Sequence, residues 1–319
     1  MPDARFDDQR HAQGSPRSDD PWGLAFQNVT VRYGNGVTGL DKVSVSVEPG
    51  DIVAVVGLSG AGKSTLMRTV NGLVPLSSGS IEVGGRDVAR LRSRALRSLR
   101  GSIGMIFQGF NLSLRSTVLS NVLVGRVSHA PWWRTMLGWY SKADTHIAYA
   151  ALNQVGLLEK VWTRASELSG GQQQRVAIAR ALAQQPRLIL ADEPVASLDP
   201  PTATAVMGYL ETINRTMGIT MLINVHSMEI ARRYANRIIG LHAGKLVFDG
   251  PASAATDAVF ERIYGKSLAD AQAADLERAA VDDMRVEHTV EHTTVTGDVL
   301  AASKRADTTG DEPSDGERA

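Results

Sequence analysis

The sequence predicts an α/β protein with a mainly parallel β-sheet flanked by helices. Two observations favour this class. Short, β-branched apolar runs alternate with segments of helical periodicity, as they do where helices connect parallel strands. The clearest runs are also almost continuously apolar, which is typical of strands buried on both faces. These runs are IVAVV at 52–56, IGMIF at 103–107, LILA at 188–191 and TMLINV at 220–225.

A glycine or a polar residue follows each predicted strand. These residues are Gly57, Gln108, Asp192 and His226. In open parallel sheets, ligands bind at the carboxyl ends of the strands. We therefore expect the four positions to converge on one crevice.

Residues 57–65, GLSGAGKST, match the phosphate-loop pattern G-x-x-x-x-G-K-[ST] between a predicted strand and the helical pattern STLMRTVNGL. The glycines let backbone N–H groups wrap phosphates, Lys63 offers a point charge and Ser64 offers a hydroxyl to Mg²⁺. We expect a bound nucleotide here. The predicted contact residues are Gly57, Leu58, Ser59, Gly60, Ala61, Gly62, Lys63, Ser64 and Thr65.

Four further positions are candidates for the chemistry of the same crevice. Asp192 is expected to hold the Mg²⁺ shell and Glu193 to reach past it to a water. Gln108 is a candidate to contact Mg²⁺ and that water, and His226 to touch a γ-phosphate. An acidic loop, a surface glutamine and a structural histidine are the alternative interpretations.

One aromatic residue and one glycine-containing helix start complete the candidates. Tyr33 is expected to stack on adenine or to pack as a core residue of a strand.

In ELSGGQQQRVAIARAL, residues Ser169, Gly170 and Gly171 are expected to leave the first N–H groups of a helix bare, and a helix N-terminus attracts phosphate. A second phosphate site makes sense if it serves a nucleotide bound to another copy of the chain. An ordinary capped helix accounts for Ser169 alone.

LSGGQ at 168–172 resembles the signature of the ATP-binding-cassette (ABC) ATPases. With the phosphate loop, Gln108, LILADE, ASLD at 196–199 and His226, it forms an ordered motif set over roughly residues 24–250. The resemblance implies an ATPase domain at 23–266 with an antiparallel β subdomain and an inserted helical subdomain at about 109–174. It also implies that Gln172 and Asp199 contact nucleotide, and that Ser169 to Gln172 close over ATP of a second copy in a head-to-tail homodimer.

Finer features are similar to the ATPase subunits of bacterial phosphonate importers. They include FQGFNLSLRSTVLSNVLVGRV, PWWRTMLGWYSKAD and RIIGLHAGKLVFDG, with Gly109 as a departure at a position where a polar residue is expected. The resemblance implies ATP and Mg²⁺ as cofactors, transmembrane permease subunits as partners, an indirect substrate-binding protein, and a place at the cytoplasmic face of the cell membrane. Trp132, Trp133 and Trp139 are expected either to contact the permease or to form the core of the helical region.

The composition of the chain argues against several other functional classes of protein. The 319 residues carry no net charge, which does not favour nucleic-acid binding, and contain no cysteine, which excludes disulfides and thiolate sites. Residues 1–22 and the acidic segment 267–319 are expected to be disordered, and no apolar run reaches the roughly 20 residues that span a bilayer. Import of another small solute and a soluble, non-transport cassette ATPase remain alternatives. A small GTPase is less favoured because the guanine-reading motif N-K-x-D is absent.

Overall fold

The computed structural model describes residues 22–129 and 138–265. The expectations for the two terminal segments, and those for Trp132 and Trp133, therefore fall almost wholly outside the described residues. Within the described ranges, none of the helices is both long enough and apolar enough to cross a membrane.

A six-stranded, mainly parallel sheet contains all four predicted strands, so the predicted fold class is confirmed. Its order is β10-β9-β3-β8-β7-β6, and only β10 runs antiparallel to its neighbour. The strands are β3 (Ile52–Val56), β6 (Ile103–Ile106), β7 (Leu188–Asp192), β8 (Thr220–Asn224), β9 (Arg237–His242) and β10 (Lys245–Pro251). Every residue of β3, β7 and β8 is buried, as the apolar runs predicted.

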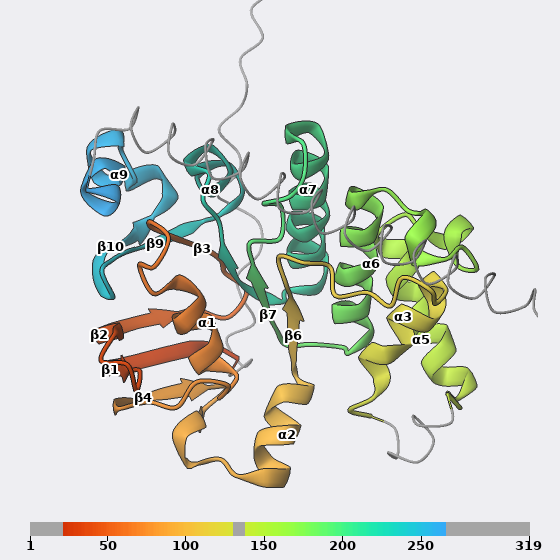
Figure 1. Cartoon of the computed structure of the whole chain (residues 1–319), viewed down its shortest axis with the longest axis horizontal. Coiled ribbons are helices and arrows are strands. Elements are labelled where there is room, and N and C mark those ends of the chain that lie inside the picture. The colour runs from red at the N-terminus through yellow and green to blue at the C-terminus, as the bar shows by residue number, and fades with distance from the viewer. Residues whose placement is uncertain (1–21, 130–137, 266–319) are drawn as a thin grey trace, which may run out of the picture. The chain divides into compact units, whose positions relative to one another are not determined.

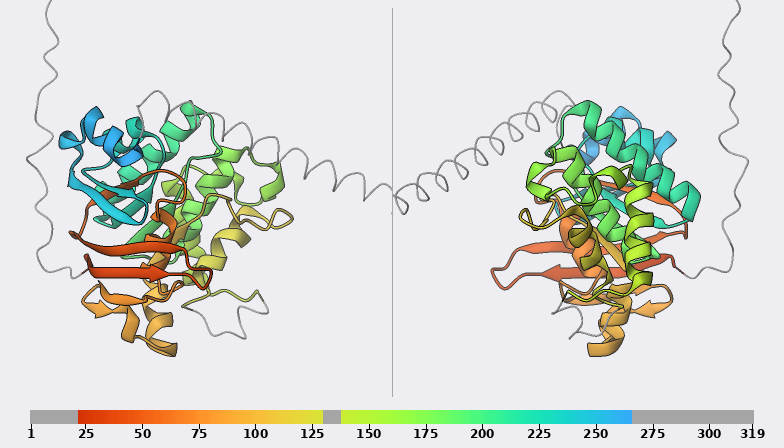
Figure 2. Two further views of the ribbon diagram at one scale, coloured as in Figure 1. Left: turned by 60° about the vertical axis from the view of Figure 1, so that its left-hand side comes forward. Right: turned by 90° about the vertical axis from the view of Figure 1, so that its right-hand side faces the viewer.

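A four-stranded antiparallel sheet, of order β2-β1-β4-β5, accounts for the N-terminal strands. They are β1 (Leu24–Arg32), β2 (Thr38–Val47), β4 (Ser78–Val83) and β5 (Arg86–Asp87). Strand β10 contacts β2, so the C-terminal part of the described chain lies beside its N-terminal strands (Figure 2). This contact brings the two sheets together at one edge.

The phosphate-loop helix packs between the two sheets. Helix α1 (Lys63–Val70) contacts β2 and β4 of the antiparallel sheet and β7 and β8 of the parallel sheet (Figure 1). Its residues Leu66, Met67 and Val70 are completely buried. Burial of such side chains stabilises the fold by about 1.5–3 kcal/mol each. The hydrophobic core therefore fixes the helix that begins at Lys63.

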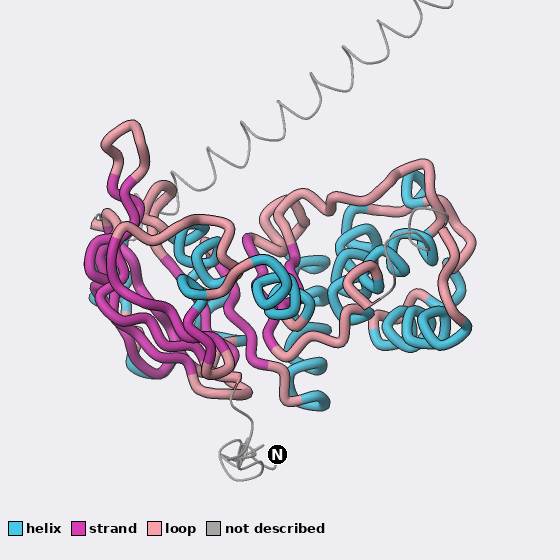
Figure 3. Tube along the Cα trace, turned by 90° about the horizontal axis from the view of Figure 1, so that it is seen from below, coloured by secondary structure: helices cyan, strands magenta, loops and turns pink. Residues whose placement is uncertain are grey.

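The other helices cover the parallel sheet or gather beside it. They are α2 (Ser93–Gly101), α3 (Val118–Leu123), α5 (Lys142–Gln154), α6 (Gly170–Ala183), α7 (Pro200–Met217), α8 (Met228–Tyr234) and α9 (Asp257–Tyr264). Helices α3, α5 and α6 pack on one another, at the side opposite the antiparallel strands (Figure 3). Helix α6 also contacts β6, which joins this group to the sheet.

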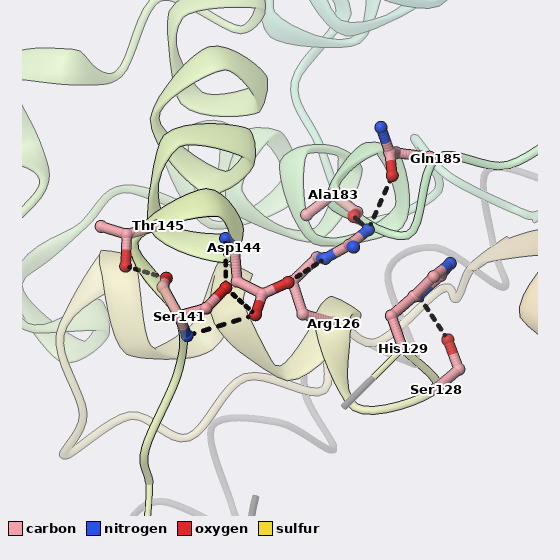
Figure 4. A network of polar contacts seen from close by, with 8 residues as sticks. All are labelled: Arg126, Ser128, His129, Ser141, Asp144, Thr145, Ala183 and Gln185. Carbon is pink, nitrogen blue, oxygen red and sulfur yellow. Dashed lines mark hydrogen bonds and ion pairs between the residues drawn. The ribbon is translucent and has the colours of Figure 1, made fainter. Parts of the chain in front are cut away.

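A buried arginine ties this helical group together (Figure 4). Arg126 is 6% exposed and donates from Nε to Asp144 Oδ1 at 2.8 Å. Its Nη1 donates to the carbonyl of Ala183 at 2.8 Å and to Gln185 Oε1 at 3.0 Å. Asp144 also closes a capping box with Ser141 at the start of α5. One guanidinium thus links the segment after α3 to the start of α5 and the end of α6.

The charge of Asp144 contributes to stability in a pH-dependent way. Burial raises its pKa, but hydrogen bonds from Ser141 and Arg126 outweigh burial and hold the pKa below its ordinary value. A carboxyl group whose pKa is depressed in the folded state stabilises the fold above its unfolded pKa. That stabilisation is lost as the pH falls through the folded pKa.

Arg126→Met is expected to lower the free energy of unfolding by about 2 kcal/mol at pH 7, because it leaves the partly buried carboxylate of Asp144 without its charged hydrogen-bond donor. The loss is expected to shrink as the pH falls below the ordinary aspartate pKa of about 4 and through the lowered pKa of folded Asp144. Chemical denaturation at several pH values measures both effects. The control, Arg115→Met, removes an exposed arginine and is expected to change stability by less than about 0.5 kcal/mol. Equal losses from the two variants would contradict the role of the network.

Candidate active site

The phosphate loop occupies the sharp connection between β3 and α1. Gly62 directly precedes α1 with a φ of 102°, a conformation that side chains rarely adopt. A Cβ atom on Gly62 would lie 2.3 Å from the carbonyl oxygen of Gly39. The backbone therefore requires glycine here, and the close contact with residue 39 holds the loop against the antiparallel sheet.

Lys63 brings a buried positive charge into this loop. Its side chain is 4% exposed, and Nζ donates to the carbonyl oxygens of Gly57 at 2.7 Å and Leu58 at 3.0 Å. A buried ammonium group needs hydrogen-bond partners or negative charge. The loop carbonyls supply such partners and keep the charge within the loop, where phosphate oxygens are expected to bind.

Asp192 joins three elements at the edge of the parallel sheet. It is the last residue of β7, and its Oδ1 accepts hydrogen bonds from Ser64 Oγ at 3.0 Å and from Asn224 Nδ2 at 2.7 Å. Ser64 lies at the start of α1, and Asn224 lies opposite Asp192 at the end of β8. The structure thus brings the two predicted Mg²⁺ ligands of α1 and β7 into contact.

This donor set fits Mg²⁺. Magnesium takes oxygen ligands, and it usually binds through one or two protein groups together with phosphate oxygens and waters. The hydroxyl of Ser64 and the carboxylate of Asp192 are such groups, and they lie beside the phosphate loop. Over residues 22–129 and 138–265, no cluster of three or more His, Cys, Asp or Glu side chains forms an all-protein metal site. A shared site with nucleotide phosphates suits the residues that are present.

Glu193 and His226 form a second pair at the same edge. Glu193 Oε1 lies 2.6 Å from His226 Nε2, and the Glu193 backbone has a φ of 53°, which is uncommon outside glycine. Burial raises the pKa of Glu193, but the hydrogen bond and charge of His226 and the charge of Lys63 outweigh it and hold the pKa below its ordinary value. Glu193 is therefore ionised at neutral pH and able to accept a proton from a water.

Two other predicted residues also lie near this edge. Gln108 is exposed and follows β6, the neighbour of β7, after one intervening residue. A Cβ atom on Gly109 would meet Asn111 Oδ1 at 3.9 Å, an ordinary van der Waals contact, so the fold does not require glycine there. Tyr33 is 39% exposed, and its hydroxyl lies 2.9 Å from Thr65 Oγ1, which places its ring beside the end of the phosphate loop. The position of Tyr33 agrees with either interpretation, contact with adenine or packing.

The start of α6 differs from the expectation of a bare helix end. Ser169 and Gln172 form a capping box: Ser169 Oγ accepts from the Gln172 N–H, and Gln172 Oε1 accepts from the Ser169 N–H at 3.1 Å. The expectation was wrong in this respect, because two of the N–H groups are satisfied within the chain. The N–H groups of Gly170 and Gly171, in the first turn, still have no preceding helical carbonyl to bond.

The second glycine of this segment also has a packing role that the sequence did not reveal. A Cβ atom on Gly171 would lie 2.2 Å from Thr202 Cγ2 in α7, so the glycine lets α6 approach α7 closely. Asp199 caps α7, accepting from the Thr202 N–H at 3.1 Å. Both helix starts are therefore held rigidly by contacts within one chain.

Sequence reasoning missed Asn224. The signal was present, because a single asparagine near the end of the apolar run TMLINV is unexpected in a buried strand. Its partner could not be identified from the sequence, since the contact with Asp192 depends on the pairing of β7 with β8.

The fold and site together define a P-loop ATPase: a phosphate loop between a buried central strand and a helix, with an acidic pair at the end of a nearby parallel strand. The family model described as ABC transporter matches residues 40–196. The chain is 53% identical over 247 residues to the phosphonates import ATP-binding protein PhnC of Staphylococcus epidermidis, covering 77% of this chain and 96% of the relative. PhnC 1 of Halalkalibacterium halodurans is also 53% identical, over 245 residues, with 77% and 95% covered. The chain belongs to the ABC transporter family of ATPases.

Two solved structures agree with this assignment. The cassette MJ0796, in a dimeric post-hydrolysis state bound to ADP and Pi, is 31% identical with a TM-score of 0.62, covering 72% of this chain and 98% of that one. The protein cbiO1 of Clostridium perfringens, part of the ABC transporter complex cbiONQ, is 27% identical with a TM-score of 0.67, covering 76% and 93%. Both likenesses extend over most of the chain described here.

Glu193→Gln is expected to slow ATP hydrolysis by roughly 10² to 10⁴-fold, because the amide cannot accept a proton from water. ATP binding is expected to persist, since the phosphate loop is unchanged. Phosphate release and binding of a fluorescent ATP analogue measure the two properties separately. Glu229→Gln, an exposed change at the start of α8, serves as the control. Turnover of Glu193→Gln at the wild-type rate would refute the assignment of Glu193.

Proposed function

We propose that the chain is the ATP-hydrolysing subunit of an importer for phosphonate or a related phosphorus oxyanion. The observation that carries this proposal is the 53% identity to proteins named as phosphonates import ATP-binding proteins, over about 95% of their length. An ATPase subunit does not itself bind the solute, so the choice of solute rests on these relatives. ATP hydrolysis at the site described above would supply the energy for import.

The residues of the site suggest their roles in hydrolysis. The phosphate loop and Lys63 would bind the phosphates, and Ser64, Asp192 and Gln108 would hold Mg²⁺. The metal would supply positive charge against the transferring phosphoryl group. Glu193 orients and deprotonates the attacking water, and His226 holds the Glu193 carboxylate through their 2.6 Å contact.

The segment at the start of α6 is proposed to act on a second copy of the chain. Its capping box fixes Ser169 to Gln172, while the N–H groups of the first turn and the positive end of the helix dipole attract phosphate. A homodimer arranged head to tail places this segment over the ATP held by the partner's phosphate loop. The solved MJ0796 relative is dimeric, which supports a dimer of this chain.

The head-to-tail dimer predicts a specific crosslink. The chain has no cysteine, so Ser59→Cys in one copy and Ser169→Cys in a differently tagged copy introduce the only thiols. Mild oxidation with ATP, in a Glu193→Gln background, is expected to join the two tagged chains. Non-reducing electrophoresis detects the product. Replacing Ser169→Cys by Ser98→Cys, an exposed site on α2, is expected to abolish it. A crosslink formed efficiently within one chain carrying both cysteines would contradict this arrangement.

A groove beside the Gln108 segment is the proposed docking site for the permease. Its volume is about 390 Å³, and its apolar lining includes Leu73, Met105, Phe107 and Val124. Val124 is 53% exposed, and Trp139 of the adjoining helical region is 63% exposed. Exposed apolar surface of this kind marks an interaction site. A permease helix seated here would hold the chain at the cytoplasmic face of the membrane, with a substrate-binding protein reached only through the permease.

The groove is connected mechanically to the site. Arg180 of α6 donates to the carbonyl oxygens of Phe110 and Asn111, which follow Gln108 in the chain, and it also lines the groove. A movement of the helical group would therefore act on the segment that carries Gln108 through Arg180. This contact offers a route by which the state of ATP influences the permease.

Uptake measurements test the proposed transport role. Co-expressed with a phosphonate permease and its substrate-binding protein, the wild-type chain is expected to support ATP-dependent uptake of a labelled phosphonate. Val124→Glu is expected to abolish uptake and co-purification with the permease, because a charge enters the apolar groove. Val127→Glu, a change at a residue that is 44% exposed but not among the groove lining, is the control. Uptake of an unrelated solute in place of phosphonates would refute the assigned substrate class.

A further inference from the structure

Asn224 is a polar residue in a position that otherwise suits an apolar side chain. It ends β8, which lies between β3 and β7 in the parallel sheet, and it is completely buried. Its neighbours Ile223 and Val225 are also buried and apolar. Asparagine is disfavoured in strands, and a buried amide needs partners for both of its polar atoms. The fold alone therefore gives little reason for asparagine here.

The side-chain amide is only half satisfied. Nδ2 lies 2.7 Å from Asp192 Oδ1, and the nitrogen must face the carboxylate because two acceptor oxygens would repel each other. Oδ1 of Asn224 is buried and has no hydrogen-bond partner within the described part of the chain. Such an unsatisfied atom lowers stability. The residue thus costs stability at one atom while it binds Asp192 with the other.

Asn224 contacts both members of the acidic pair. Its side chain binds Asp192, and its backbone oxygen accepts the N–H of Glu193 at 3.2 Å. The second bond holds the turn in which Glu193 adopts its φ of 53°. The orientation of the Mg²⁺-binding carboxylate and the direction of the water-binding carboxylate therefore depend on the same residue of β8.

We propose that Asn224 is a positioning residue for ATP hydrolysis: its amide fixes the orientation in which the Asp192 carboxylate faces the metal site. Both donors to Asp192 share one oxygen, Oδ1. The hydroxyl of Ser64 is itself a proposed Mg²⁺ ligand, through an oxygen lone pair, while its hydrogen stays available to Asp192. The amide of Asn224 is the donor to that oxygen that takes no part in binding the metal. This inference rests on the proposed Mg²⁺ roles of Ser64 and Asp192.

Asn224→Leu keeps the approximate size of the side chain and removes the donor. We expect kcat for ATP hydrolysis to fall about 10 to 100-fold, the usual effect of losing a group that orients a metal ligand. ATP affinity in the presence of a chelator is expected to stay within about twofold, because the phosphate loop is intact. The increase in affinity on adding Mg²⁺ is expected to become smaller. A fluorescent ATP analogue and a steady-state assay measure these quantities.

Two companion variants distinguish positioning from support of the fold. Asn224→Thr restores one hydroxyl donor and is expected to recover part of kcat and of the Mg²⁺ effect. Thr220→Val changes a buried polar residue at the opposite end of β8 and is expected to leave both unchanged. Melting temperatures are recorded for all three variants with the full chain.

The outcomes distinguish the role of Asn224 from the proposed metal roles of Ser64 and Asp192. Wild-type kcat and Mg²⁺ effect in Asn224→Leu would overturn the role of Asn224 alone. So would losses that follow the melting temperature and recur in Thr220→Val. Wild-type hydrolysis that is independent of Mg²⁺ would instead overturn the metal roles of Ser64 and Asp192. A selective loss in Asn224→Leu, with part of it recovered in Asn224→Thr, supports the positioning role.

Discussion

The shared hydrogen bonds to Asp192 Oδ1 are the interaction on which the site depends. They connect the start of α1, the end of β7 and the end of β8, through Ser64 and Asn224. These elements can meet only because β3, β8 and β7 are parallel neighbours, so that their carboxyl ends share one edge of the sheet. The order of the strands is thus the constraint that turns separate motifs into one site.

Two buried charges explain why so many hydrogen bonds form at the carboxyl edge of the parallel sheet. Lys63 is 4% exposed and Asp192 is 8% exposed, and buried charges are costly unless they are paired and hydrogen-bonded. The loop carbonyls stabilise the ammonium group, while hydroxyl and amide donors stabilise the carboxylate. The positive φ of Glu193 is strained backbone held by the same surroundings. The geometry suited to phosphate and metal is therefore maintained by bonds within the chain.

The sequence allowed the prediction of the central strands and of the phosphate loop, both of which depend on local pattern. The four buried strands were identified because β-branched apolar runs are unambiguous when both faces are covered. The phosphate loop was identified because its glycines and lysine have fixed spacing. The antiparallel sheet and the helical group were expected only from family resemblance, since alternating or short elements carry weaker signals. Both are present in the structure.

Side-chain contacts between residues far apart in the chain could not be predicted from the sequence. Asn224 contacts Asp192 across 32 positions, and Arg126 reaches Ala183 across 57, so neither pattern is local. The start of α6 differs from the expectation for a different reason. Ser169 and Gln172 have the three-residue spacing of a capping box, and this local pattern predicts the observed cap, whereas the glycines alone predict bare N–H groups. The need for glycine at 171 comes from Thr202 of another helix.

A crystal structure of the chain with Mg²⁺ and an ATP analogue that cannot be hydrolysed tests the central claim most directly. The account predicts that Lys63 Nζ moves from the carbonyls of Gly57 and Leu58 to the phosphates. It also predicts that Ser64 Oγ binds the metal, while the contact of 2.7 Å between Asn224 Nδ2 and Asp192 Oδ1 persists. A nucleotide bound elsewhere, or a metal that touches neither Ser64 nor Asp192, would contradict it.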